Sequence, residues 1–195
     1  MQLMQRDRKR ILGEYLVAAA RTGDRQACGQ LARLWHADLL RHAWRLTGDA
    51  ELARDTVQDA WIDIVRGLGN LTDPAAFPAW AYRIVTRRSA RTIAGLQRSR
   101  RTASALAAQP EAADHAQQDA ESRADQGPLA KALAALPAEQ RSVMALYYID
   151  DFSVAEIAVA LTIPAGTVKT RLMHARRKMR AALDRPDRGG SDDGI

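Results

Sequence analysis

The sequence predicts an all-α protein built from two small helical domains. Nearly every ordered segment repeats its apolar residues at helical spacing, and no run alternates like a strand for more than a few positions. A chain of 195 residues is long enough for one ordinary domain or two small ones. Large apolar residues almost vanish between residues 103 and 127, which is typical of a linker and favours two domains.

Charge and cysteine content narrow the class of protein. Lysine and arginine total 29 against 23 acidic residues, and the net charge of +6 favours a polyanionic partner such as nucleic acid. The single cysteine, Cys28, excludes an internal disulfide, and no cysteines and histidines have zinc-site spacing. We therefore expect a reduced protein with no metal and no cofactor.

No membrane-spanning or export segment is expected. The longest uncharged stretch, residues 157–168, is too short to cross a bilayer and contains Pro164. The first ten residues lack the apolar core of a signal peptide. The sequence therefore predicts a cytoplasmic protein without membrane insertion.

Four helical segments are expected in residues 1–102. Gly23 and Gly48 end the first two, while Asp49 and Asp73 stand at the N-cap positions of the third and fourth. The apolar stripes of the first two helices consist of Ile11, Leu12, Tyr15, Leu16 and Ala19, and of Leu31, Leu34, Trp35, Leu39 and Leu46.

The third helix, which runs to about residue 68, has an acidic outer face. Its apolar stripe consists of Ala53, Val57, Ala60, Trp61 and Ile64. An isoleucine among acids on the other side indicates either a protein-docking face or an ordinary solvated face with one exposed apolar residue. The aspartates are not expected to be catalytic, because no nucleophile or glycine-rich phosphate loop accompanies them. The outer face consists of Asp55, Gln58, Asp59, Ile62 and Arg66.

The fourth helix combines arginines with aromatic residues. Its apolar stripe of Phe77, Trp80, Ala81 and Ile84 is continued by arginines, so the helix is expected to emerge from its core. Such a helix can neutralise phosphates and offer rings to unpaired bases. Alternatively both aromatic residues fill the core, which is favoured for Trp80 and open for Tyr82. The candidate nucleic-acid contacts are Tyr82, Arg83, Arg87, Arg88 and Arg91.

Charge reverses sign where the first domain ends. Residues 80–102 contain seven arginines and no acid, whereas residues 103–127 contain five acids and one arginine. Helical periodicity returns at residue 128 and continues to about residue 183. The expected organisation is a first domain over 1–102, an acidic linker over 103–127, a second domain over 128–185 and a disordered tail over 186–195.

The second domain contains a helix-turn-helix pattern. Ser153 and Glu156 form a capping box at the start of a short helix, and Pro164 and Gly166 break the chain before a longer basic helix. At 100° per residue, Val168, Leu172, Ala175 and Met179 form the inward stripe of that second helix.

The other side of the basic helix is the candidate DNA-reading face. A recognition helix usually presents its N-terminal part to base edges, and neighbouring basic residues reach phosphates. The alternative is an amphipathic helix with a solvated basic face, but the capping box, turn and basic helix together favour DNA binding. The outward residues are Thr167, Lys169, Thr170, Met173, His174 and Arg177.

These segments resemble bacterial sigma factors of the extracytoplasmic-function (ECF) group over roughly residues 16–101 and 129–183. The first part resembles sigma region 2 through RLTGDAELARDTVQDAWIDIVRGL and FPAWAYRIVTRR. The second resembles region 4 through LPAEQRSVMALYYIDDFSVAEIAVAL and IPAGTVKTRLMHARRKMRAAL. Both phrases in this order, with an acidic linker between them, are strongly specific.

The resemblance implies binding to core RNA polymerase, through its β′ clamp helices and β subunit, and to promoter DNA. Asp55, Gln58 and Asp59 would dock on the clamp helices. Region 2, including residues 69–73 and the fourth helix, would capture the minus-ten element and hold it open. The minus-thirty-five element would be read through Lys169, Thr170, Met173 and His174.

Members of this group are usually held inactive by an anti-sigma factor, which is therefore a further expected partner. Many relatives carry Asn and Asp where this chain has Arg87 and Arg91. Cys28 occupies a position often held by a large apolar residue, so we expect it to pack in the core. The chain is expected to be a non-enzymatic alternative sigma factor. Rival hypotheses are a helix-turn-helix regulator that acts without polymerase and an interaction protein that does not read DNA.

Overall fold

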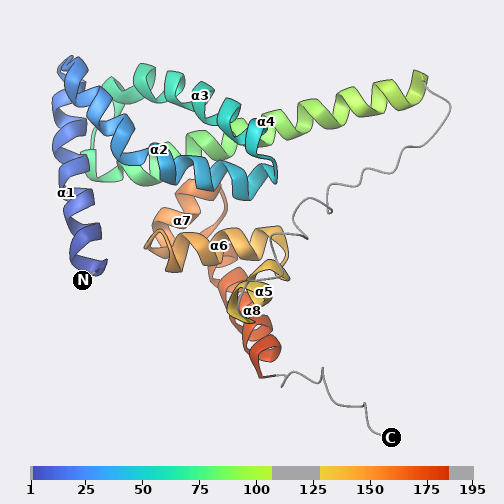
Figure 1. Ribbon diagram of the computed structural model, residues 1–195. Helices are drawn as coiled ribbons and strands as arrows, with labels where there is room; N and C mark the ends of the chain where they lie inside the picture. Colours follow the sequence, from blue (N-terminus) through green and yellow to red (C-terminus); the bar gives the residue numbers. More distant parts are fainter. Residues whose placement is uncertain (1, 107–127, 185–195) are drawn as a thin grey trace, which may run out of the picture.

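The computed structural model describes residues 2–106 and 128–184, and all regular structure in these two ranges is helical (Figure 1). None of the helices described is long and apolar enough to cross a membrane. The helices are α1 (Gln2–Arg21), α2 (Arg25–Thr47), α3 (Ala50–Gly67), the 3-10 helices η1 (Leu68–Asn70) and η2 (Pro74–Ala76), α4 (Phe77–Leu106), α5 (Pro128–Ala134), α6 (Ala138–Tyr148), α7 (Val154–Leu161) and α8 (Ala165–Leu183).

Helix boundaries follow the predicted capping residues. The side chain of Asp49 accepts hydrogen bonds from the backbone N–H groups of residues 51 and 52, and Asp73 caps η2 in the same way. Gly48 ends α2 with a φ of 71°, a left-handed conformation that costs glycine no side-chain clash. Ser153 and Glu156 form the complete capping box at α7. The predictions for Gly48, Asp49 and the Ser153–Glu156 box are confirmed, whereas Asp73 caps the short 3-10 helix directly before α4 and not α4 itself.

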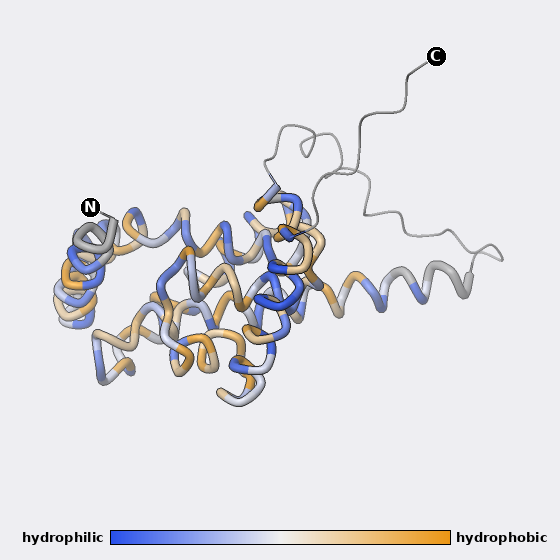
Figure 2. Tube along the Cα trace, turned by 90° about the horizontal axis from the view of Figure 1, so that it is seen from below, coloured by the Kyte–Doolittle hydropathy of each residue, from blue (hydrophilic) through white to orange (hydrophobic). Residues whose placement is uncertain are grey.

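Helices α1 to α4 form the first half of the molecule (Figure 1). Leu31 and Leu39 from α2, Val57 and Ile64 from α3, and Phe77 from α4 are fully or almost fully buried. Apolar positions recur along each helix, where Figure 2 shows them in orange. Cys28 is half-buried on α2, so the prediction of core packing is met only in part.

The predicted stripe of α1 is wrong in part. Ile11, Leu12 and Tyr15 are 66%, 46% and 70% exposed, whereas Leu16 and Val17 are buried. The helix is rotated so that Gly13 faces the indole of Trp35, where an added Cβ would lie 3.1 Å from Nε1. Helical spacing identified the elements but not this rotation, because apolar residues occur on more than one side of α1.

Helices α5 to α8 form the second half and contain the predicted helix-turn-helix. Val168, Leu172, Ala175 and Met179 are buried, as the periodicity of α8 predicts. Helix α4 ends at residue 106, a few residues inside the segment expected to be a linker. The rest of that segment, residues 107–127, and the expected tail, residues 186–195, lie outside the described residues.

The two halves share one apolar core. Helix α7 packs against α4 (Figure 1), and the Phe152 ring, in the connection between α6 and α7, lies 4.8 Å from the Tyr82 ring of α4. Ile157 of α7 is completely buried in the same core. In this structure the halves are therefore docked on one another.

Candidate nucleic-acid interface

Helix α8 presents the outward face that its sequence predicts. Lys169, Thr170, Met173 and Arg177 are exposed, with Met173 at 57%, while Thr167 and His174 are half-buried. A shallow depression of about 310 Å³ on this face is lined by Lys169, Met173, Arg176, Arg177 and Arg180. The face therefore combines cations with an apolar side chain, as contacts to phosphates and to thymine methyl groups require.

Local hydrogen bonds set the donors and acceptors of this face. The Thr170 hydroxyl donates to the carbonyl of Gly166 at 3.0 Å, which leaves its lone pairs free to accept. An Arg177 guanidinium nitrogen lies 3.2 Å from His174 Nδ1. Because a guanidinium can only donate, the neutral His174 carries its proton on Nε2, which is then a donor for an external acceptor.

Two arginines of α8 are held against α6 instead. Arg176 Nε donates to the Tyr148 hydroxyl at 2.9 Å, and its guanidinium lies over the rings of Tyr147 and Tyr148. Arg171 pairs with Glu139. These contacts orient α8 on the domain, so Arg176 is less free to reach phosphates than its neighbours.

On α4, three of the predicted arginines are exposed. Arg83, Arg87 and Arg91 follow one another at four-residue spacing, which places them on one side of the helix. Within residues 2–106 and 128–184, no acidic side chain lies within ion-pair distance of any of the three. This side of α4 is thus a positively charged surface.

Arg88 points the other way, toward α3. Its Nε donates to Asp63 Oδ2 at 2.6 Å, and its Nη1 lies 3.3 Å from Asp59 Oδ2. This hydrogen bond lowers the pKa of Asp63 and raises the pKa of Arg88. In this structure two carboxylates hold the Arg88 guanidinium, so it is not free for a phosphate, and its role in DNA binding stays a prediction.

Tyr82 is also placed differently from the prediction. It is only 1% exposed, and its ring lies 4.7 Å from His42 and 4.8 Å from Phe152. Burial raises the pKa of its hydroxyl well above the ordinary value, and Asp150 adds to the effect. The alternative that Tyr82 fills the core is correct here, since the second half of the molecule covers its ring.

The outer face of α3 is exposed as predicted. Asp55, Gln58, Asp59 and Ile62 all reach solvent, with Asp59 61% exposed at its side chain and Ile62 44% exposed. Val65, 52% exposed, lies one turn beyond Ile62 and was not predicted. Val65 follows Ile62 by three residues and does not belong to the buried stripe, and this spacing could have predicted that it lies on the same exposed face. Together these residues make an acidic face with an apolar centre.

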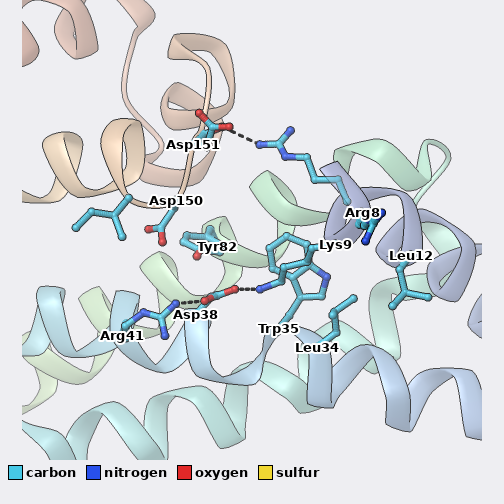
Figure 3. A pocket seen from close by; sticks show the side chains of 12 residues that line it. Arg8, Lys9, Leu12, Leu34, Trp35, Asp38, Arg41, Tyr82, Asp150 and Asp151 are labelled. Atoms are coloured by element: carbon cyan, nitrogen blue, oxygen red, sulfur yellow. Dashed lines mark hydrogen bonds and ion pairs between the residues drawn. The ribbon is translucent and has the colours of Figure 1, made fainter. Parts of the chain in front are cut away.

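A cleft of about 610 Å³ follows the seam between the two halves (Figure 3). Lys9 and Arg41 both pair with Asp38 there, and Arg10 donates to the backbone carbonyl of Asp151 at 3.0 Å. Arg10 also binds Glu156 at 2.8 Å. Burial raises the pKa of Glu156, but hydrogen bonds from Ser153 and Arg10 outweigh burial and bring the pKa below its ordinary value.

A second ion pair of the seam is almost fully buried. Arg45 Nη1 lies 2.8 Å from Asp150 Oδ2, and the two side chains are 10% and 5% exposed. Beside it, burial lowers the pKa of His42 to about 3, and the charge of Arg45 adds to the effect. No local pattern in the sequence indicates the pairing of Arg45 with Asp150, because the two residues lie 105 positions apart in the chain.

Comparison with known proteins accounts for both halves. Residues 31–101 match the family Sigma-70 region 2, and residues 126–179 match Sigma-70, region 4. The ECF RNA polymerase sigma factor SigM of Mycobacterium tuberculosis is 35% identical over 172 residues, which cover 86% of this chain and 83% of SigM. The chain belongs to the ECF sigma factors. Sigma factors bind RNA polymerase and direct transcription, and the prediction of this family is confirmed.

Other relatives of this sigma factor agree. The RNA polymerase sigma-H factor of Pseudomonas aeruginosa is 29% identical over 87% of this chain and 93% of that protein. The structure of CnrH in complex with the cytosolic domain of CnrY superposes with a TM-score of 0.59, at 25% identity, over 89% of this chain and 97% of CnrH. The sigma factor RpoE of Bartonella quintana, solved with the anti-sigma factor NepR, has the same fold, with a TM-score of 0.61 over 80% of this chain and 98% of RpoE.

Region 2 of the sigma factor thus corresponds to the half with the acidic face of α3 and the basic side of α4. Region 4 corresponds to the half with α8. Within residues 2–106 and 128–184, no cluster of three or more histidine, cysteine or acidic residues has the arrangement of a metal site. The exposed charged surfaces of α3, α4 and α8 are its candidate functional sites.

Proposed function

We propose that this sigma factor directs core RNA polymerase to a set of promoters by reading two DNA elements with its two regions. The observation that supports this is the separation of three surfaces: an acidic, apolar-centred face on α3 and two basic faces on α4 and α8. A protein that joins a polymerase to DNA needs surfaces of unlike chemistry in this way. The sigma factor itself contributes specificity and no catalytic step.

Region 4 reads the minus-thirty-five element through α8. Lys169, Thr170, Met173 and His174 approach base edges, and Met173 supplies an apolar contact of the kind that recognises thymine methyl groups. Thr167 and Arg177, at the margins of this face, bind the flanking phosphates. The Nε2–H of His174, set by its contact with Arg177, donates to a base or phosphate acceptor.

Region 2 captures the minus-ten element and holds the melted strand. Arg83, Arg87 and Arg91 of α4 neutralise its phosphates. Because Arg87 and Arg91 stand where many relatives carry Asn and Asp, this chain relies more on charge at these two positions. The ring of Tyr82 joins the DNA surface only if region 4 moves away from α4.

The outer face of α3 binds the polymerase. Asp55, Gln58, Asp59 and Ile62 dock on the clamp helices of the β′ subunit, and Val65 extends the apolar centre of the contact. Region 4 meets the β subunit, and an anti-sigma factor holds the protein inactive in the cytoplasm until a signal releases it. These partners follow from family membership.

Runoff transcription with purified core polymerase and genomic promoter fragments tests the proposal. Asp59→Arg should abolish polymerase binding, whereas Glu14→Arg, the same charge reversal at an exposed site on α1, should leave it intact. His174→Ala should change the sequence preference at the upstream element and keep polymerase binding.

The sigma role would be refuted if the chain and core polymerase together initiated at none of the genomic promoters. Tight sequence-specific DNA binding by the chain alone would instead favour a polymerase-independent regulator. Polymerase binding without promoter recognition would favour an interaction protein.

A further inference from the structure

Helix α4 continues well beyond the core as a free-standing arm. In Figure 1 its C-terminal half extends away from all other described helices, and in Figure 2 hydrophilic positions recur along it. From residue 96 onward, the described side chains are exposed all around the helix: Leu96, Gln97, Arg98, Ser99, Arg101 and Thr102. A helical segment that is exposed on every side gains no stability from packing in a core, so an external contact is the feature to look for.

The arm carries two further arginines on the same side as the basic residues of region 2. At 100° per residue, five exposed arginines of α4 fall within a sector of about 80° around the helix axis. This arginine ridge runs along the helix from Arg83, in the body of region 2, to Arg101 in the arm. It consists of Arg83, Arg87, Arg91, Arg98 and Arg101.

Within the described residues, the ridge has no internal counter-charge. The whole of α4, residues 77–106, contains no acidic residue, and no described acid lies within ion-pair distance of any ridge arginine. Like charges three or four residues apart destabilise a helix by about 0.2–0.5 kcal/mol per pair. Arg88, on another side of α4, has two carboxylate partners. The ridge is therefore complementary to an external polyanion.

We propose that Arg98 and Arg101 bind duplex phosphates between the two promoter elements, so that the arm extends the DNA surface of region 2. This rests on the proposed function. Ten residues separate Arg91 from Arg101, a rise of about 15 Å, which corresponds to about four base pairs at 3.4 Å each.

Double-stranded DNA fits the arm better than a melted strand. Proteins that hold single strands offer aromatic rings on which bases stack, and residues 96–102 contain none. A straight row of cations on one side of a helix matches the regular phosphates of a duplex backbone. The contact is thus independent of base sequence and strongly dependent on salt.

The double variant Arg98→Ala/Arg101→Ala tests the proposal, because alanine preserves the helix. Holoenzyme binding to a promoter fragment identified by runoff is measured over a series of salt concentrations. Each lost phosphate contact reduces the slope of log K against log salt by about 0.9, so we expect a reduction of about 1.8 and roughly 10- to 30-fold weaker binding near 0.15 M salt. Arg98→Lys/Arg101→Lys should restore the slope, and Ser99→Ala should not change it.

Promoters with neutral methylphosphonate linkages locate the contact. Four such linkages just upstream of the minus-ten element should weaken the wild type and leave the double alanine variant unaffected. An unchanged salt slope would overturn the proposal in favour of a solvated helix. Sensitivity only to linkages in the melted strand, or a loss confined to core polymerase binding, would also overturn it. The sigma role itself is tested separately, by whether the wild-type holoenzyme initiates transcription at the promoter. A failure of the arm proposal can therefore be distinguished from a failure of the proposed function.

Discussion

Removing the carboxylate of Asp150 should release region 4 from region 2. The change Asp150→Ala leaves the guanidinium of Arg45 without its partner in a site where the two side chains are only 10% and 5% exposed. At an effective dielectric constant of 20, two charges 4 Å apart attract by about 4 kcal/mol, and an intact buried pair gains little net stability because desolvation offsets this attraction. An unpaired buried charge, in contrast, costs about 3–5 kcal/mol.

The expected effect is a shift from docked to separated halves. A cost of about 3 kcal/mol multiplies the ratio of separated to docked molecules by roughly 100. Single-molecule energy transfer can measure this ratio with dyes at Glu51→Cys on α3 and Lys178→Cys on α8, in a Cys28→Ser background. The wild type should show one docked population and Asp150→Ala a second, separated one.

A double replacement provides the control. In Arg45→Met/Asp150→Leu both charges are absent, so the seam should stay docked to a greater extent than in Asp150→Ala alone. Equal separation in the single and double variants would show that the pair is not the source of the effect. An unchanged distance distribution in Asp150→Ala would refute the claim that the buried pair holds the seam.

Two further predictions concern the stability of each region. The folded-state pKa of His42 is about 3, below the ordinary value of 6.5, so the unfolded chain binds the proton first as the pH falls. As the pH falls from 6.5 to 3, the free energy of unfolding measured in urea titrations should drop by about 1.4 kcal/mol per pH unit, or about 2 kcal/mol from pH 6.5 to 5. The variant His42→Gln should lack this dependence of the free energy of unfolding on pH. An equal pH dependence in the wild type and the variant would contradict the prediction. Ser153→Ala should cost about 1 kcal/mol by thermal unfolding, because α7 loses its capping box, whereas exposed Ala155→Ser should change stability by less than half as much.

Local chemistry explains why much of the fold could be predicted. The capping residues Asp49 and Ser153 and the left-handed Gly48 act within a few residues of themselves, so their roles follow from neighbouring positions alone. The inward stripe of α8 follows from helical periodicity for the same reason. The exposure of the α3 face was predicted on this basis and is confirmed; its binding to polymerase remains a proposal.

The candidate site was harder to predict where a side chain depends on distant parts of the chain. Arg88 continues the apolar stripe of α4, but only the packing of α3 beside it supplies two carboxylates. Tyr82 has the chemistry of a base-stacking residue, yet Phe152 from the other half covers its ring. Neither fact has a signal in the residues adjacent in sequence.

The sequence by itself determined the helices, their caps, the two regions, the family and the charge carried by each surface, because these depend on residue type and short-range spacing. Tertiary structure decided which of those charges remain available. It pairs Arg88 with α3, buries Tyr82, joins Arg45 to Asp150 and leaves the arginine ridge of α4 exposed. The physical reason is that pairing and burial depend on three-dimensional proximity, which brings together residues 25 to more than 100 positions apart.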